Sequence, residues 1–289
     1  MTIFWAGLSH ASKSGRATRK KVSSRFMAGF FSSVTKVGKS LLKLKKTLKQ
    51  SSGFRKFVPE TGKDRTIWIM KRLCIVSLLI LAAVAASAQP KKVSVLGDSY
   101  STFQGYNPDN YRPFYPDANN DVKEVEQTWW SLYIQAKGYE LEKNNSWGAT
   151  TICGAGFFGR DVTPSCFLSR VFMLGDPDII FVFGGTNDAW QRVPLGEYKY
   201  EGLTKADCMT FRPALAYLLQ TLKQLYPKAK VVSILNSELQ EEVNESMREV
   251  CKHCGVQLVE LHDIDKQNGH PSIAGMKSIC DQLLEQVAD

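Results

Sequence analysis

The chain has 289 residues, enough for two domains, and a formal net charge of +9. Sixteen of its 37 Lys and Arg residues but only two of its 28 Asp and Glu residues lie in residues 1–69, so residues 70–289 are acidic on balance. The main body of the chain therefore gives no electrostatic argument for binding nucleic acid, which requires a basic surface.

Residues 1–69 form a basic leader, which we interpret as a mis-assigned translation start ahead of Met70 or as a disordered segment. The alternative interpretation is that residues 1–69 have a function of their own. Residues 37–50 mix Leu and Lys in a pattern that would give a basic amphipathic helix, able to bind membranes or nucleic acid.

Residues 70–88 have the layout of a secretory signal peptide. Lys71 and Arg72 form a positive start, residues 73–86 are apolar, and small residues precede Gln89. The apolar run is shorter than the roughly 20 residues of a membrane-spanning helix, so an uncleaved anchor is the second choice. We predict cleavage near Ala88, export to the periplasm or the medium, and a mature domain of residues 89–289 without a membrane span.

Strand and helix patterns alternate five times along this mature domain. Short apolar runs predict strands, and amphipathic runs predict helices. The expected strands are 92–96, 141–146, 178–183, 230–235 and 256–261, and the expected helices are 124–137, 167–174, 211–226, 238–252 and 272–287. The alternation predicts an α/β fold, with helices on both faces of a parallel sheet and ligands at the carboxyl ends of its strands.

Four polar features fall at these strand ends or in the loops just beyond them: Ser99, Gly148, Asn187 and His270. Ester hydrolysis needs such a set, because a serine hydroxyl is a weak nucleophile until a base, typically histidine, takes its proton. The oxyanion that forms needs fixed donors. The backbone N–H groups of Ser99 and Gly148 and the side-chain amide of Asn187 would supply three.

In order and placement these features resemble the sequence blocks of the SGNH (GDSL) hydrolases. The matching blocks are Gly97-Asp98-Ser99, Gly148, Gly184-Gly185-Thr186-Asn187-Asp188 and His270-Pro271. The resemblance covers about residues 93–287. It implies a three-layer α/β/α, flavodoxin-like fold with a five-stranded parallel sheet. It also implies serine esterase, lipase or acyl-hydrolase chemistry without a metal or organic cofactor, with the roles above carried by these four residues.

The chain departs from the family pattern at the acid of the triad. The family places an Asp three residues before the catalytic His, and here that position is Gln267. Three interpretations follow. Asp265 reaches His270 through a differently shaped loop, or the site works as a Ser–His dyad with a backbone carbonyl or Gln267 Oε1 accepting the imidazole N–H, or the enzyme is impaired. We favour the first two.

Aromatic residues near the blocks favour a carbohydrate ester as the substrate. The predicted loop 101–121 is rich in aromatic residues, and a second aromatic patch contains Trp190. We predict an exported esterase that acts on small-molecule or polysaccharide esters, above all carbohydrate O-acetyl esters. The candidate substrate-binding residues are Tyr100, Trp147 and Trp190. The alternatives are a lipase or thioesterase, and a catalytically silent carbohydrate-binding protein.

Six of the seven cysteines lie in the mature domain, an even number that permits disulfides in an exported chain. Cys153 with Cys166 and Cys251 with Cys254 are the nearest pairs. The Cys251-Lys252-His253-Cys254 motif has no second motif of its kind to complete a zinc site, so we expect no metal there. Buried free thiols or a single structural bridge are the favoured interpretations.

Overall fold

A computed structural model describes residues 67–77 and 89–288. The chain divides into two units, Met1–Ala88 and Gln89–Asp289, and residues 67–77 of the first unit are helical. Most of the predicted leader and signal peptide, with the expected basic helix 37–50, lies outside the described residues. Within the two described ranges, no helix combines the length and apolar character needed to cross a bilayer.

The second unit is built on a five-stranded parallel sheet with the strand order β2-β1-β3-β4-β5. Its strands are β1 (Lys92–Gly97), β2 (Glu140–Ser146), β3 (Ile179–Phe183), β4 (Lys230–Leu235) and β5 (Gln257–Glu260). This is the flavodoxin-like order, which places the switch point between β1 and β3, where ligands bind beyond the strand ends. The predicted fold class is confirmed.

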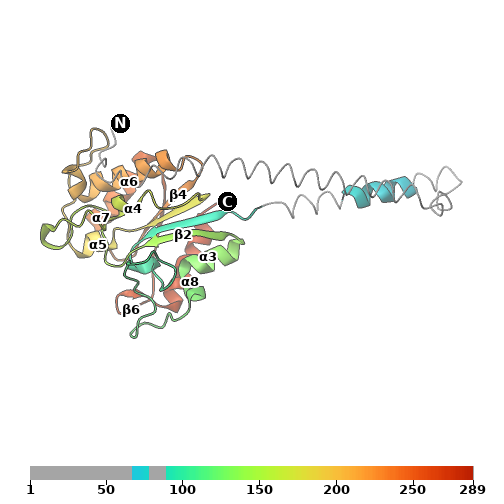
Figure 1. The fold of residues 1–289 in the computed structure, drawn as a ribbon, viewed down its shortest axis with the longest axis horizontal. Helices are drawn as coiled ribbons and strands as arrows, with labels where there is room; N and C mark the ends of the chain where they lie inside the picture. The colour runs from blue at the N-terminus through green and yellow to red at the C-terminus, as the bar shows by residue number, and fades with distance from the viewer. Residues whose placement is uncertain (1–66, 78–88, 289) are drawn as a thin grey trace. The chain divides into compact units, whose positions relative to one another are not determined.

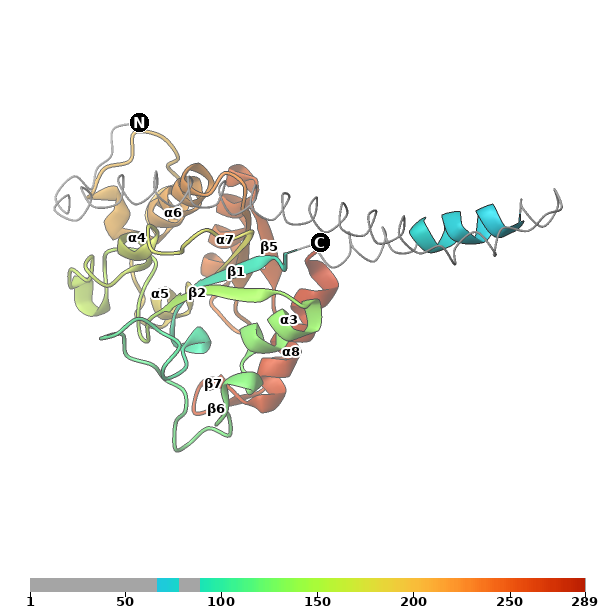
Figure 2. The same cartoon turned by 45° about the vertical axis from the view of Figure 1, so that its right-hand side comes forward.

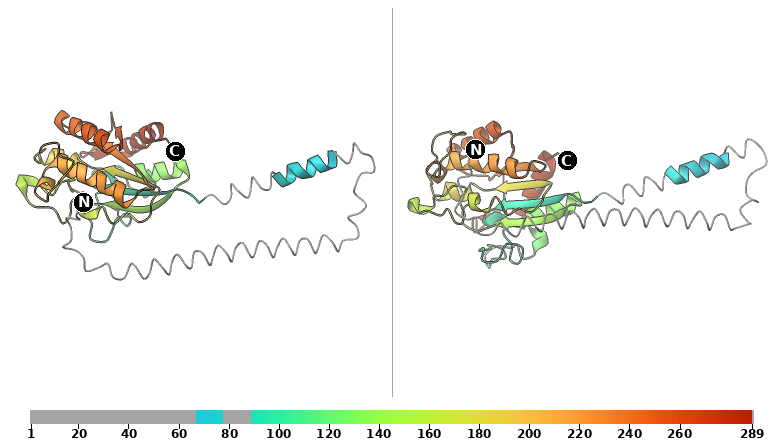
Figure 3. Two further views of the ribbon diagram at one scale, coloured as in Figure 1. Left: turned by 90° about the horizontal axis from the view of Figure 1, so that it is seen from above. Right: turned by 45° about the horizontal axis from the view of Figure 1, so that its top comes forward.

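Helices cover both faces of the sheet (Figures 1, 2 and 3). They are α3 (Trp129–Lys137), α4 (Phe167–Arg170), α5 (Thr186–Trp190), α6 (Phe211–Leu225), α7 (Glu241–Cys254) and α8 (Ile273–Gln286). On one face α3 packs against α8, and α6 packs against α7 in the other layer. The protein is therefore a three-layer α/β/α domain.

The core forms because alternate residues of each buried strand point to opposite faces. All five residues of β3 are buried, as a central parallel strand requires. Val95 and Phe181 join Trp129 of α3 and Ile279 of α8 in one apolar cluster. The opposite face is covered by α6, whose stripe includes the fully buried Leu218. The two helix layers thus bury both faces of the sheet.

The predicted helices differ from the observed ones at their starts and ends, and the helix expected at 167–174 already ends at Arg170. The helix expected at 124 begins at Trp129, because Val125–Gln127 form a separate 3-10 turn closed by a capping box between Glu124 and Gln127. Gly138 ends this helix in the left-handed conformation. The sequence analysis missed α5 and a two-stranded hairpin, β6 (Lys266–Gln267) and β7 (His270–Pro271).

All seven cysteines are free, and the six in residues 89–289 are buried. Of the two predicted alternatives, the structure contains buried free thiols and no bridge. Burial raises the pKa of Cys251 to about 12, so this thiol stays protonated at neutral pH. In the described ranges, no group of His, Cys, Asp and Glu side chains is arranged to hold a metal ion.

Candidate active site

Ser99 stands at the carboxyl end of β1, where the strand turns directly into a 3-10 turn, Ser99–Ser101. The Asp98 carboxylate caps this turn by accepting the N–H of Tyr100 at 3.0 Å. Glycine is required at position 97, because a Cβ there would lie 2.7 Å from the side chains of Ser101 and Ser146. The Gly-Asp-Ser block thus builds a tight turn that presents the serine hydroxyl.

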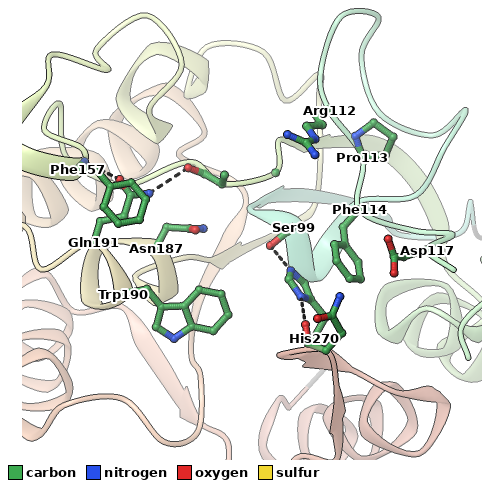
Figure 4. A pocket seen from close by; sticks show the side chains of 13 residues that line it. Ser99, Arg112, Pro113, Phe114, Asp117, Phe157, Asn187, Trp190, Gln191 and His270 are labelled. Carbon is green, nitrogen blue, oxygen red and sulfur yellow. Dashed lines mark hydrogen bonds between the residues drawn. The ribbon is translucent and has the colours of Figure 1, made fainter. Parts of the chain in front are cut away.

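His270 reaches Ser99 from the hairpin of β6 and β7. The two turn residues, Asn268 and Gly269, have φ values of 51° and 71°, the pattern of a type I′ turn, for which Asn-Gly is the preferred pair. The Nε2 atom of His270 lies 2.9 Å from Ser99 Oγ, and its Nδ1 atom lies 3.1 Å from the carbonyl oxygen of Asn268 (Figure 4). Both imidazole nitrogens are therefore engaged.

Neither Asp265 nor Gln267 hydrogen-bonds to the imidazole of His270. The Asp265 carboxylate instead hydrogen-bonds to the hydroxyl of Ser272, the N-cap of α8. The Gln267 side chain accepts the Asp121 N–H at 2.8 Å and donates to the Asp121 carboxylate at 3.1 Å. Of the expected partners of the imidazole N–H, the one found is a backbone carbonyl, that of Asn268. Asp265 and Gln267 do not face His270, because both side chains hold the hairpin and α8 in place.

Three buried side chains anchor the histidine hairpin through its backbone carbonyls. Tyr100 donates its hydroxyl to Gly269 at 2.7 Å, and Tyr115 donates to Pro271 at 2.8 Å. The Asn120 amide lies within 3.1–3.3 Å of three hairpin carbonyls, that of Pro271 among them. Tyr100 is fully buried and does not line the pocket, so the structure contradicts its predicted contact with substrate.

Asn187 lies in α5, whose start at Gly185 needs a left-handed residue with φ of 97°. The Asn187 amide faces the Asp98 carboxylate, yet within the described part of the chain its Nδ2 atom is buried without a hydrogen-bond partner. In the same ranges the Asp98 Oδ2 atom is also buried without a partner, and the Asn187 amide helps to lower the pKa of Asp98, so the two groups are close neighbours. The backbone N–H of Ser99 likewise has no acceptor among the described residues.

The third expected oxyanion donor, the backbone N–H of Gly148, already makes a hydrogen bond within the protein. The backbone N–H of Gly148 donates to the carbonyl oxygen of Arg112 at 3.0 Å. In this conformation Gly148 is therefore unavailable to an oxyanion, which differs from its predicted role. The contact needs glycine, because a Cβ at position 148 would lie 2.8 Å from the same oxygen.

A buried arginine fixes the strand ends beneath the site. Arg170 donates to the carbonyl oxygens of Gly97 at 3.2 Å and Asn145 at 2.5 Å, which lie at the ends of β1 and β2. Burial lowers the pKa of Arg170 to about 10, so it stays charged at neutral pH.

Two buried aspartates lie near the site. Burial raises the pKa of Asp98 to about 7. Asp188 accepts the N–H groups of the next loop, at Ile152 and Cys153, and so ties that loop down.

Ser99, Asn187 and His270 line a pocket of about 490 Å³. Figure 4 shows Ser99, Asn187 and His270 facing it, together with residues of its rim. Trp190 and Phe157 line it and are about half exposed, at 45% and 54%. Trp147 instead stacks on Tyr111, with ring centroids 4.4 Å apart, and does not line the pocket. Of the three predicted substrate-binding residues, only Trp190 faces the pocket.

Sequence reasoning missed several residues of the site. Asn268 had a visible signal in the Asn-Gly pair that precedes His270. Asp117 lines the pocket from the predicted loop 101–121, in which no local pattern distinguishes it from its neighbours, whereas Phe114 is one of the aromatic residues that distinguish that loop in the sequence. Gln191 holds the rim by accepting the Phe157 N–H at 2.9 Å.

The family model of GDSL-like lipase/acylhydrolase matches residues 91–287. A GDSL-like lipase from Bacteroides uniformis is 51% identical, with a TM-score of 0.68 over 71% of this chain and 98% of that one. A GDSL-like lipase from Bacteroides ovatus is 49% identical, with a TM-score of 0.68 over 68% and 98%. A Lactobacillus plantarum protein shares the fold at 21% identity and a TM-score of 0.51, over 68% and 96%. No curated protein matches the chain.

Proposed function

The chain belongs to the GDSL-like lipase/acylhydrolase family and is a carboxylic ester hydrolase, and we propose that Ser99 and His270 are its catalytic pair. The observation that carries the proposal is the 2.9 Å contact between Ser99 Oγ and His270 Nε2 at the wall of the pocket. We further propose that the enzyme is exported and that carbohydrate O-acetyl esters are its substrates.

The two nitrogens of His270 have different tasks in this mechanism. Nε2 takes the proton of Ser99 Oγ as the oxygen attacks the ester carbonyl, and later gives it to the leaving alcohol. Nδ1 keeps its proton, which it donates to the carbonyl oxygen of Asn268 at 3.1 Å. That hydrogen bond selects the tautomer with a free electron pair on Nε2, so the backbone replaces the orienting carboxylate of a triad. A second cycle with water releases the acyl group.

The oxyanion of the tetrahedral intermediate would be bound by two donors that lack acceptors among the described residues, the N–H of Ser99 and the Asn187 amide. Donors that are already fixed stabilise developing charge without reorganisation, and each typically contributes roughly 2.7–4 kcal/mol.

The proposed preference for carbohydrates rests on the rim of the pocket. Trp190 and Phe157 expose about half of their surfaces beside Ser99, and exposed aromatic faces are suited to stacking on sugar rings. The preference for a short acyl group rests on the two rings that both line the pocket beside Ser99 and pack around His270, Phe114 and Trp190.

The catalytic pair is tested by hydrolysis of an aryl acetate by residues 89–289 and by its Ser99→Ala variant. Ser131→Ala, on the surface of α3, is the matched serine control. We expect Ser99→Ala to abolish turnover and the control to retain it. If the folded parent is inert toward short and long esters alike but binds oligosaccharides, the silent carbohydrate-binding protein becomes the better interpretation.

The substrate class is tested by comparing acetylated xylan oligosaccharides with long-chain acyl and thioester substrates. We expect the highest kcat/KM on the acetylated oligosaccharides. A preference for long acyl chains would favour a lipase, and a preference for thioesters would favour a thioesterase.

Export is proposed from the signal peptide at residues 70–88. Sequencing the N-terminus of the native protein tests it, with Gln89 as the expected first residue. A native product that begins before Met70 would contradict both the cleavage and the mis-assigned start.

A further inference from the structure

The imidazole of His270 is covered on one face by the ring of Phe114. The two ring centroids lie 3.5 Å apart and the planes are within 8° of parallel. Figure 4 shows this ring beside the imidazole. The Phe114 backbone is fixed as well, because its N–H donates to Thr102 Oγ1 at 2.7 Å, and that hydroxyl donates to the Ser99 carbonyl at 2.9 Å. Phe114 therefore contacts His270 through its ring and is linked through Thr102 to the backbone of Ser99.

The other rings around His270 approach it differently. Tyr100, Trp190 and Tyr115 have centroids 5.2, 6.1 and 6.4 Å from the imidazole, at interplanar angles of 54° to 84°. Among these four rings, Phe114 alone is stacked parallel to the imidazole. A cation within about 6 Å of an aromatic face is attracted by the negative charge density above the ring.

None of the charged and titratable groups that face His270 forms a direct ion pair with its imidazole in the described part of the chain, so the aromatic face can contribute to stabilising the cation. Arg112 and Asp117 line the same pocket, and the hydroxyls of Tyr100 and Tyr115 are committed to hairpin carbonyls. Burial lowers the pKa of His270, and the hydrogen bond to Asn268 and the charge of Asp117 oppose that shift. Yet no carboxylate in the described ranges is hydrogen-bonded to either ring nitrogen.

We propose that Phe114 is a positioning residue of this esterase, which holds the imidazole plane against Ser99 and stabilises the imidazolium that forms during attack. The proposal rests on the Ser99–His270 pair of the preceding section. The proton moves from Ser99 Oγ to His270 Nε2, while the Nδ1 proton stays hydrogen-bonded to the Asn268 carbonyl. The new cation therefore lacks an anion in direct contact among the described residues, and the Phe114 face supplies part of the stabilisation that a triad carboxylate would give.

The test compares Phe114→Leu with Phe114→Tyr. Leucine keeps an apolar cover but removes the aromatic face, whereas tyrosine keeps both. We expect Phe114→Leu to lower kcat by about 2- to 30-fold, the rate equivalent of a cation–π contact, with a smaller change in KM. Because the imidazolium loses stabilisation, the acidic limb of the kcat/KM profile should move to lower pH. Phe114→Tyr should restore both values.

A direct titration of the His270 imidazole by NMR provides a readout that does not depend on turnover. Phe157→Leu is the matched control, because Phe157 lines the same pocket without stacking on His270. We expect the control to leave the pKa of His270 unchanged and Phe114→Leu to lower it. Thermal unfolding of each variant establishes that it is folded.

Equal rates and equal pH limbs for Phe114→Leu and Phe114→Tyr would overturn the proposal, as would a rise in the pKa of His270 in Phe114→Leu. Either result would leave Phe114 as ordinary packing. An active Ser99→Ala variant would instead refute the catalytic pair, and the NMR titration would still decide whether Phe114 stabilises the imidazolium.

Discussion

Restoring the family's acid at position 267 should impair this enzyme rather than improve it. The Gln267 side chain both accepts from and donates to Asp121, and the Asp121 carboxylate also accepts the N–H of Ile273, the first residue of α8. In Gln267→Asp the side chain is one methylene shorter and, when ionised, cannot donate. It would also place a second negative charge beside Asp121.

The size of the effect follows from these contacts. Both hydrogen bonds are exposed, so each contributes at most roughly 0.5–1.5 kcal/mol to folding, and their loss together costs at most about 1–3 kcal/mol. For a domain of this size 1 kcal/mol corresponds to a shift of roughly 2–4 °C in Tm, so a fall of several degrees is expected. Activity should fall with it, because the hairpin that loses its anchor carries His270 and the Asn268 carbonyl.

The assay combines kcat for an aryl acetate with Tm measured across pH. Repulsion from Asp121 raises the pKa of the carboxyl introduced at position 267 in the folded protein. The protonated state is thus the better tolerated one, and the loss in Tm relative to the parent should shrink as pH falls. The double variant Gln267→Asp with Asp121→Asn is the control, since an amide at 121 can donate to the introduced carboxylate and should recover stability. A Gln267→Asp variant that is faster than the parent and equally stable would refute this reasoning.

Three further predictions follow from the same geometry. Asn187→Ala should lower kcat by about 10²- to 10³-fold, and a change of less than threefold would contradict its role. Because burial lowers the pKa of His270, the acidic limb of kcat/KM should lie below pH 6.5, and a pH–rate profile with its limb above that value would argue against this base. Trp190→Ala should raise KM for an acetylated oligosaccharide more than for an aryl acetate, and equal changes for both would count against sugar stacking.

The layout of the fold was predictable because local patterns set it. The apolar run of β3 and the alternation of strands with amphipathic helices fix a parallel sheet, and parallel strands bring their carboxyl ends to one edge. That rule places Ser99, Asn187 and His270 at one pocket although they are far apart in the chain. The hairpin that carries His270 was also within reach, since Asn268-Gly269 is a strong turn signal.

The residues that hold the site together were not predictable, because their partners are distant in sequence or lie on another element. Asp265 lies close to His270 in the chain, yet its carboxylate binds the hydroxyl of Ser272 at the start of α8. Tyr100 follows the nucleophile directly, but its hydroxyl crosses to Gly269 and its ring is buried. Nothing in the neighbouring residues distinguishes a side chain that faces the pocket from one that faces the core.

The backbone N–H of Gly148 has two possible acceptors, the Arg112 carbonyl and the oxyanion, and the two hydrogen bonds differ in free energy. This N–H now bonds to the carbonyl oxygen of Arg112, a contact worth roughly 0.5–1.5 kcal/mol net. A donor aimed at the oxyanion is worth roughly 2.7–4 kcal/mol in the transition state. The exposed Arg112 segment can exchange its lost hydrogen bond for one with water. We therefore propose that the Gly148 N–H exchanges its hydrogen bond with Arg112 for one with the oxyanion in the transition state. Because Pro113 restricts the Arg112 backbone, residues 112 and 113 would have to move together.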